Sequence, residues 1–396
     1  MSGPARKMTH LADRPPRVPL ITPEIAGDAL KRFARNGYLA VRALALKARR
    51  QPLARPGAIE EPGRILVIRL DRLGDVVLTT ALLRALRIRF PQARVGVAVR
   101  SAFAPLLRVQ PYLDEVIEAR DQKRIKQGKA AAWDVILDPL DSYSLASARL
   151  AAALRPGAST GYAIAGRGVF FTHPAPPPAL ASLTEQSVRL ASTLGWQLPL
   201  LRPQLELPEE ARRRAADRLA QQGNKPWLVV AVGGHYPTQR LPSATMGEAA
   251  GRIAQEHGLG VVVVGGPGEG QRATDVAAAA MITRSQPKPV IAANLTVMEL
   301  AALLAQARLV FANNSGPLHL AAALGVPTLS TLGPTDPVRF APVGSTPEAR
   351  HRTIRLGVAC SPCNLGKCSH HTCLAAIQAS RLVEAAQDLL TAGRKG

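Results

Sequence analysis

Residues 309–337 constrain the fold most strongly, because two apolar segments there flank a short segment with both helix-boundary signals. Residues 309–312 are an apolar run that predicts a buried strand, and a turn cluster, Asn313-Asn314-Ser315-Gly316, ends it. Pro317 stands where a helix would begin and Gly325 where it would end, the positions that proline and glycine favour. A second strand is predicted at residues 327–332, so the pattern indicates a strand, a short helix and a parallel strand.

This order aims the N-terminus of the short helix away from the carboxyl end of a strand. In open α/β sheets, ligands bind at that edge. Free N–H groups at a helix N-terminus also favour phosphate and other anions. An ordinary strand–turn–helix without a ligand has the same pattern, so a phosphate site and a purely structural connection both remain open here.

The length and charge of the chain narrow the class of protein. A chain of 396 residues predicts two domains, each with its own core. The formal net charge of +22 favours anionic partners such as nucleic acid, anionic lipid or phosphorylated substrates. No apolar run reaches the ~18 residues of a membrane span. Arg and Pro interrupt residues 1–54 throughout, which argues against a signal peptide, so we expect a cytoplasmic protein.

Four parts are predicted along the chain. Residues 1–62 are a basic, Pro-rich leader, expected to be helical or partly disordered. Its Leu30, Phe33, Val41 and Leu44 fall near one helical face, which could lie on an anionic membrane or dock on the protein itself. Residues 63–200 and 201–379 each alternate strand and helix, which predicts parallel sheets covered by helices, with a hinge zone at residues 200–223. Residues 380–396 are predicted to be a helix that packs back on the first domain.

The regular elements expected in these two domains follow from apolar runs, helical periodicity and boundary residues. Strands are predicted at residues 65–70, 94–99, 116–117, 135–137, 227–232, 260–264, 309–312 and 327–332. Helices are predicted at residues 76–90, 243–257, 270–281, 296–305 and 380–390.

A second loop that indicates chemistry follows the first predicted strand, in the sequence RLDRLGDVV. Gly74 permits a tight turn with a close backbone approach. Asp75 stands at the start of the next helix, where an aspartate can serve as an N-cap. The same place at the carboxyl edge of the sheet suits a general base that faces a cleft. Asp71, beside Arg72 in this loop, competes for the role of base.

These two stretches together resemble a known family. RLDRLGDVVLTTALLRALRIRFPQARV is similar to the opening strand, loop and helix of the bacterial family-nine glycosyltransferases, the lipopolysaccharide heptosyltransferases. NNSGPLHLAAALGVPTLSTLGPTDP resembles the nucleotide-sugar motif of that family, and VAVGGHYPTQRLP and VVVVGGPGEG resemble its intervening loops. The resemblance covers residues 64–385 and implies a GT-B fold. In that fold two doubly wound Rossmann-like domains, one for the acceptor and one for the nucleotide sugar, face a central cleft.

The resemblance also implies an activity and a site. It implies inverting, metal-independent transfer, with no cofactor required, of a heptose or related sugar from an ADP-sugar to a glycan or glycolipid such as lipopolysaccharide core. Contact through the basic leader would place this cytoplasmic protein at the inner face of the cytoplasmic membrane. Asp75 matches the catalytic base, and a partly closed cleft can raise the pKa of such a carboxylate. Asp71, Arg72 and Gly74 belong to the acceptor loop. Residues implied to bind the donor, with N–H groups of residues 315, 316 and 318 facing its diphosphate, are Arg240, Glu269, Leu295, Asn314, Ser315, Gly316 and His319.

Two departures from the family pattern leave the donor open. Gln239 stands where the family has a lysine that neutralises donor phosphate, so Arg240 is expected to do this alone. Asn314 stands where the family commonly has an aspartate that contacts the transferred sugar. Asparagine keeps the shape of that side chain but loses its charge and its purely accepting character.

All four cysteines lie between residues 360 and 373, at Cys360, Cys363, Cys368 and Cys373. The spacing C-x2-C-x4-C-x4-C suits a structural zinc, with His370 and His371 as substitute ligands, although a loop of reduced thiols is the alternative. This spacing and the charge of +22 support a second hypothesis: a non-catalytic, basic GT-B-like protein that binds nucleic acid or anionic lipid. We favour the transferase, with no nucleic-acid partner, because Asp75 and the Ser315-Gly316 turn both stand where its chemistry needs them.

Overall fold

The computed structural model describes residues 37–38, 40–41, 57–119, 133–223, 225–283, 287–344 and 350–391. By its internal contacts the chain divides into Met1–Gln51 and Pro52–Gly396, and both sheets belong to the second part. In the first part residues 37–38 and 40–41 are helical, and Val41 is exposed. Leu30, Phe33 and Leu44 lie outside the described residues, so membrane contact through the leader stays a prediction. No helix among the described residues is long and apolar enough to span a membrane.

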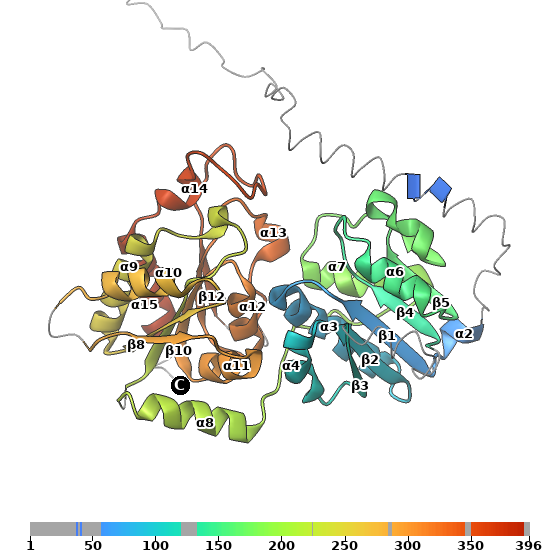
Figure 1. Cartoon of the computed structure of the whole chain (residues 1–396), viewed down its shortest axis with the longest axis horizontal. Helices are drawn as coiled ribbons and strands as arrows, with labels where there is room; N and C mark the ends of the chain where they lie inside the picture. Colours follow the sequence, from blue (N-terminus) through green and yellow to red (C-terminus); the bar gives the residue numbers. More distant parts are fainter. Residues whose placement is uncertain are drawn as a thin grey trace, which may run out of the picture. The chain divides into compact units, whose positions relative to one another are not determined.

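The first sheet has six parallel strands in the order β3-β2-β1-β4-β5-β6 (Figure 1). The central β1 pairs with β2 and β4, so that Ile65 lies opposite both Val95 and Val135. The strand order reverses between β1 and β4, which is where a doubly wound sheet opens a crevice. Its strands are β1 (Arg64–Arg69), β2 (Arg94–Val99), β3 (Glu115–Glu118), β4 (Val135–Asp138), β5 (Ala158–Tyr162) and β6 (His173–Ala175).

The second sheet repeats this topology, in the order β12-β11-β10-β7-β8-β9, again with all strands parallel. Here β7 is central and pairs with β8 and β10, so the order reverses between β7 and β10. Its strands are β7 (Trp227–Ala231), β8 (Gly260–Gly265), β9 (Val290–Ala293), β10 (Ala307–Asn313), β11 (Thr328–Thr331) and β12 (His351–Ile354).

Helices connect the strands of both sheets. The domain built on the first sheet is called the first domain, and the domain built on the second sheet is called the second domain. The first domain contains α2 (Gly57–Glu60), α3 (Leu73–Arg89), α4 (Ala104–Arg108), α6 (Ala146–Ala153) and α7 (Leu183–Arg189), with 3-10 turns η1 (Ser101–Phe103), η2 (Ile164–Phe170) and η3 (Leu190–Leu194). The second contains α8 (Glu209–Ala220), η4 (Pro237–Gln239), α9 (Ser243–His257), α10 (Gly270–Ala279), α11 (Val297–Ala305), α12 (Gly316–Ala323), α13 (Pro337–Phe340), α14 (Thr372–Ala375) and α15 (Ala379–Thr391).

Both faces of each sheet are buried, as expected for parallel sheets covered by helices. Alternate side chains of β7 point to opposite faces. Leu228 and Val230 join a core with residues of α9, α10 and α15, whereas Val229 and Ala231 join a core with residues of α11 and α12. Figure 1 shows these two groups of helices on opposite sides of the second sheet. The α/β architecture with parallel sheets predicted from the alternating pattern is thus confirmed.

Four strands have no counterpart in the sequence analysis: β5, β6, β9 and β12. The segment that forms β5 is ASTGY, whose small and polar side chains make no apolar run, yet every residue of it is buried. β6, β9 and β12 are short and none is fully buried. An apolar run in the sequence predicts a central strand. A strand without such a run, which forms because it pairs with a neighbouring strand, is not predicted by this pattern.

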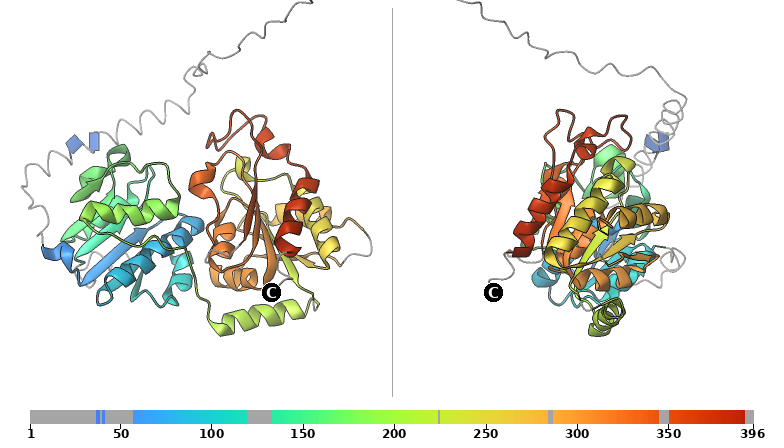
Figure 2. Two further views of the ribbon diagram at one scale, coloured as in Figure 1. Left: turned by 180° about the vertical axis from the view of Figure 1, so that it is seen from behind. Right: turned by 90° about the vertical axis from the view of Figure 1, so that its left-hand side faces the viewer.

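The C-terminal helix corrects one prediction. α15 packs against α9 and strands β10, β11 and β12, all in the second domain, and Figure 2 shows α15 in red beside α9. The expectation that it returns to the first domain is therefore wrong among the described residues. Its apolar side chains, including Leu382 and Leu389, are buried in the core of the second domain, which leaves no apolar face for another partner.

The segment before α8, predicted as part of a hinge zone, runs between the two domains and bonds to both. The backbone N–H of Gln204 donates to Thr80 Oγ1 over 3.2 Å, and that of Glu206 donates to Gln110 Oε1 over 3.0 Å. Between them, the N–H of Leu205 donates to the carbonyl of Ala323 in the second domain. Whether this segment flexes stays a prediction.

Candidate active site

One large cavity, of about 1090 Å³, is lined by loops that follow the central strands of both sheets. The loop after β1 contributes residues 72–75, the loop after β7 residues 233–235 and 239–240, and the turn after β10 residues 314–316. All three loops leave the carboxyl ends of strands at the points where the strand order reverses, which is where doubly wound sheets bind ligands. The cavity is therefore the leading candidate for the functional site.

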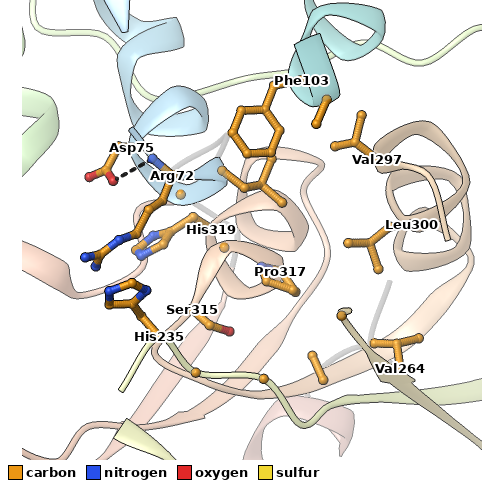
Figure 3. Close-up of a pocket in the computed structure, with 18 of the residues that line it drawn as sticks. Arg72, Asp75, Phe103, His235, Val264, Val297, Leu300, Ser315, Pro317 and His319 are labelled. Carbon is orange, nitrogen blue, oxygen red and sulfur yellow. Dashed lines mark hydrogen bonds between the residues drawn. The ribbon is translucent and has the colours of Figure 1, made fainter. Parts of the chain in front are cut away.

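Asp75 lies on the wall of this cavity that the first domain forms (Figure 3). It is the third residue of α3 rather than its N-cap: Arg72 holds the cap position, and its backbone N–H donates to Asp75 Oδ2 over 3.4 Å. The N-cap interpretation is thus wrong, because the helix begins three residues earlier than the predicted helix at residues 76–90. Asp71 is not among the residues that line the cavity, so of the two candidate bases only Asp75 faces it.

The opposite wall is the N-terminus of α12. Ser315 is the N-cap, and Ser315, Gly316, Pro317 and His319 line the cavity. Among the described residues, the N–H groups of Ser315 and Gly316 donate to no protein acceptor. The N–H of Leu318 donates to the Ser315 carbonyl over 3.1 Å, so the prediction that it faces an anion is wrong. Two free donors thus remain at the helix end that favours anions.

His319 lies one turn into α12 and is 4% exposed. Its Nδ1 atom is buried without a hydrogen-bond partner, an arrangement that usually marks a site for a ligand or water. Burial lowers the pKa of this imidazole to about 4, although the charge of Asp75 works against that change. At neutral pH His319 is therefore a neutral donor or acceptor in the cavity.

Two glycines let α3 and α12 approach each other at the cavity. A Cβ atom on Gly316 would lie 2.9 Å from Leu73 Cβ, and one on Gly74 would lie 2.9 Å from His319 Cδ2. The predicted close approach at Gly74 is thus real, and it is made to the second domain. Neither glycine has a left-handed backbone, so space alone excludes a side chain.

Replacing Gly316 by alanine is expected to lower stability by about 1–3 kcal/mol, the usual cost of overpacking. We also expect at least a tenfold loss of activity, because a displaced α12 moves its N–H groups relative to Asp75. Urea unfolding and initial rates measure both. Gly357→Ala is the control, since nothing lies within 4 Å of its added methyl group. A Gly316→Ala protein that matches the control would show that the two helices do not pack this closely.

The loops after β7 and β8 place two charged side chains at the cavity. Glu269, the residue before α10, accepts a hydrogen bond from the Gly266 N–H over 2.7 Å. Arg240 donates from Nε to the Gly234 carbonyl over 2.9 Å, and its Nη2 lies 3.9 Å from Glu269 Oε1. Gln239 lines the cavity and accepts from the Tyr236 N–H. The basic charge at this loop is therefore Arg240, partly offset by Glu269.

Asn314 lines the cavity and donates from Nδ2 to the Phe340 carbonyl over 2.7 Å. Its amide group is therefore held from α13. The neighbouring Asn313, which the sequence analysis treated only as part of a turn, is fully buried. It accepts from the Leu241 N–H over 2.9 Å and donates to the Val232 carbonyl over 2.9 Å. Asn313 thus ties the turn after β10 to both ends of the loop after β7.

The far end of the cavity is apolar. Figure 3 shows Val297 and Leu300 of α11 facing Phe103 of the first domain, with Val264 below them. The predicted Leu295 also lines this end, with Met298. Thr296 caps α11 by accepting the Glu299 N–H. This region suits a flat aromatic group, such as a nucleobase, whose faces can pack on apolar side chains.

The cavity therefore changes in character along its length. Figure 3 shows Asp75, Arg72 and His235 at one end, Ser315, Pro317 and His319 in the middle, and Val297, Leu300 and Val264 at the other end. Arg72 is exposed and lies 5.7 Å above the ring of Tyr236 in the second domain. Burial lowers the pKa of His235, and the nearby guanidiniums of Arg72 and Arg240 lower it further. Along its length the cavity thus has a charged part, then an anion-binding part, then an apolar part.

A model of the family described as glycosyltransferase family 9 (heptosyltransferase) matches residues 122–373. The chain belongs to glycosyltransferase family 9. Its relatives include lipopolysaccharide heptosyltransferase 2 of Salmonella typhimurium, which is 25% identical over 354 residues, 83% of this chain and 99% of the relative. The predicted resemblance is confirmed, and with it the prediction that this protein is a glycosyltransferase.

Solved structures show the fold of this family-9 transferase. The E. coli ADP-heptose lipopolysaccharide heptosyltransferase II has a TM-score of 0.71 and 24% identity, covering 84% of this chain and 99% of its own. E. coli heptosyltransferase WaaC, solved with ADP, has a TM-score of 0.63 and 18% identity, covering 82% and 99%. It has also been solved with ADP-2-deoxy-2-fluoro heptose. These structures confirm the predicted GT-B fold.

The cysteine segment of the transferase corrects another prediction. The four thiols are free, and the described residues contain no group of three or more His, Cys, Asp or Glu side chains arranged to hold a metal ion. A structural zinc is therefore not supported. Instead, the segment packs on the loop after β7: His371 Nε2 lies 2.7 Å from the Thr238 carbonyl, and Thr238 Oγ1 donates to the Leu365 carbonyl. Its spacing alone could not show this role.

Several side chains of the transferase cavity were missed by the sequence analysis. Phe103, His235 and Phe340 line the cavity but have no sequence signal that marks a role, although His235 lies in the quoted loop VAVGGHYPTQRLP. Arg69, which lies behind the cavity wall and does not line the cavity, was also missed, although a sequence signal existed. It is an arginine at the end of an apolar strand, two residues before Asp71 and six before Asp75, and it is fully buried.

Proposed function

We propose that this chain transfers a heptose from ADP-heptose to the core of lipopolysaccharide, with inversion at the anomeric carbon and with Asp75 as general base. The observation that carries the proposal is the order of chemical character along the cavity. An apolar end, a helix N-terminus and a carboxylate match the nucleobase, the diphosphate and the reacting sugar of one nucleotide-sugar. The names of the relatives support this donor and acceptor.

The diphosphate would lie at the N-terminus of α12. The free N–H groups of Ser315 and Gly316, and the positive end of the helix dipole, stabilise the negative charge that develops as ADP departs. His319 can complete this site, since its Nδ1 lacks a protein partner. Arg240 supplies the positive charge for the donor phosphate that the uncharged Gln239 lacks.

The reaction needs one base and one face of attack. The acceptor hydroxyl oxygen forms a bond to the anomeric carbon while the bond from that carbon to the diphosphate oxygen breaks. The hydroxyl proton passes to the Asp75 carboxylate, and ADP carries away the electron pair. No step calls for a metal ion, so catalysis without one stays our prediction. Arg72, exposed beside Asp75, is placed to contact an anionic group of the acceptor.

A binding screen tests the donor. Purified protein is titrated calorimetrically with ADP, UDP and GDP at two salt concentrations and without added metal. Selective binding of ADP is the expected result, followed by transfer from ADP-heptose to a core acceptor. If no nucleotide binds, the proposed function fails. The basic binding protein that uses nucleic acid or anionic lipid would then be favoured, and its affinity should fall steeply with salt.

Arg240→Ala is expected to weaken ADP binding by about 10- to 100-fold, because a charged hydrogen bond to phosphate contributes about 1.5–3 kcal/mol. Arg252→Ala is the matched control, since Arg252 pairs with Glu248 on α9 and does not line the cavity. Calorimetry with ADP measures both variants. Equal affinity of the two would show that the diphosphate does not contact Arg240.

A further inference from the structure

A buried arginine stands directly behind Asp75. Arg69 ends β1 and is 1% exposed, in a strand whose other buried side chains are apolar. Its Nη1 donates to the Pro139 carbonyl over 2.9 Å. Its Nε lies 3.2 Å from Asp71 Oδ1, and its Nη2 lies 3.3 Å from Asp75 Oδ1. Each nitrogen of this guanidinium thus has an oxygen beside it.

The two carboxylates share one edge of the guanidinium. Nε and Nη2 form the edge that commonly holds both oxygens of a single carboxylate. Here one oxygen of Asp71 and one of Asp75 lie beside these two nitrogens as ion pairs, so the two side chains lie next to each other, although Arg69 Nε and Asp71 Oδ1 make no hydrogen bond. A buried arginine that faced Asp75 alone would favour its ionised form and weaken it as a base. A second carboxylate on the same edge offsets that effect.

We propose that Arg69 and Asp71 are positioning residues for Asp75: Arg69 holds its carboxylate at the cavity wall, and Asp71 shares the positive charge so that Asp75 stays basic enough to accept a proton. This inference rests on the proposed role of Asp75 as the general base. Neither residue touches the substrate, because neither lines the cavity. Both act through the orientation and the electrostatic environment of Asp75.

Other charged groups also surround this unit. Asp138 and Asp141, at the end of β4 and in the loop after it, face Arg69. Arg72 follows Asp71 in the same loop, and His235 and His319 face Asp75 from the second domain. Burial lowers the pKa of both imidazoles. Burial raises the pKa of Asp71 to about 6, against the effect of Arg69, so its charge changes within the range of an activity assay.

The test compares the pH dependence of kcat/KM for the full-length enzyme and its variants between pH 4.5 and 9. The acid limb of this profile is the pH range in which kcat/KM falls as the pH is lowered, and the plateau is its constant value at higher pH. Asp71→Asn removes the second negative charge, so we expect the acid limb to lie about one pH unit lower and the plateau value of kcat/KM to fall by about tenfold. Arg69→Met removes the positive charge, so the limb should move up while kcat falls. Arg69→Lys keeps the charge but replaces the rigid, planar guanidinium with one ammonium group on a flexible chain, so it should lower kcat with little change in the pH of the acid limb.

Asp134→Asn is the matched control. Asp134 also binds the chain at β1, but at the opposite end, where its Oδ2 accepts from the Gly63 and Arg64 N–H groups over 2.8 and 2.9 Å. Its acid limb should coincide with that of the wild type. If Asp71→Asn and Arg69→Met lower activity but leave the limb in place, or move it in the same direction, the inference is overturned.

A second measurement separates this inference from the proposed function. Carbon-13 NMR of labelled aspartate carboxylates, with Asp75 assigned by the Asp75→Asn variant, follows the titration of Asp75 without turnover. Opposite movements of its midpoint in Asp71→Asn and Arg69→Met support the inference. If Asp75→Asn keeps full activity, the proposed base is wrong, yet the midpoints still report the coupling. An unchanged midpoint in both variants overturns the coupling, whatever Asp75 does in catalysis.

Discussion

Replacing Asp75 by asparagine is expected to lower kcat by about 10³-fold, within the range that general-base catalysis contributes. Asparagine has the size of aspartate but cannot take up the acceptor proton. The fold and ADP affinity should be kept, because the side chain lies at the cavity wall, 21% exposed, and the free donors for phosphate are on α12. Initial rates of transfer, with ADP binding measured alongside, test this.

The control for this variant is Asp336→Asn. Asp336 is a carboxylate at the start of α13, where its Oδ1 accepts the Val338 N–H over 2.8 Å, and it does not line the cavity. Asparagine is an equally good N-cap, so this enzyme should retain its rate. An Asp75→Asn enzyme within threefold of the control would remove Asp75 from the mechanism.

Arg167→Met is expected to destabilise the first domain by about 3–5 kcal/mol, the usual cost of leaving one partner of a buried ion pair alone. Both Arg167 and its partner Asp138 have fully buried side chains. Arg167 also donates to the Leu140 carbonyl and, over 3.3 Å, to Ser147 Oγ. Removing it leaves the Asp138 carboxylate unpaired at the carboxyl end of β4.

The loss should depend on pH. Burial raises the pKa of Asp138, an effect that the charge of Arg167 opposes. Without Arg167 the folded protein favours protonated Asp138 more strongly, so its stability relative to wild type should improve as the pH falls from 7.5 to 5. Urea unfolding at several pH values measures this. Arg214→Met, at an exposed pair on α8, is the control and should unfold like the wild type. A pH-independent difference would contradict a charge left unpaired.

The fold could be predicted largely from the sequence, because a parallel sheet buried on both faces requires apolar runs in its central strands. β2 and α9 begin and end at the predicted residues, and β1, β7 and β10 lie within two residues of the prediction. Edge strands such as β12 have no such run, so pairing with β11 decides them. The boundary of α3 was misplaced because Arg72 and Leu73 carry no helix signal.

The motifs of the sequence by themselves determined the family, the two-domain α/β class and the three loops that meet at the cavity, because glycine turns and strand ends are local features. Tertiary structure alone decided which aspartate faces the cavity. Asp75 lies in the first turn of α3 and lines the cavity, whereas Asp71 lies in the loop before α3 and does not. Tertiary structure also decided that Arg69 lies beside both carboxylates and that the N–H group of Leu318 already has a backbone acceptor. These outcomes depend on the positions of individual atoms after folding. They also depend on burial, which takes Arg69 out of water and leaves it only the protein oxygens around it.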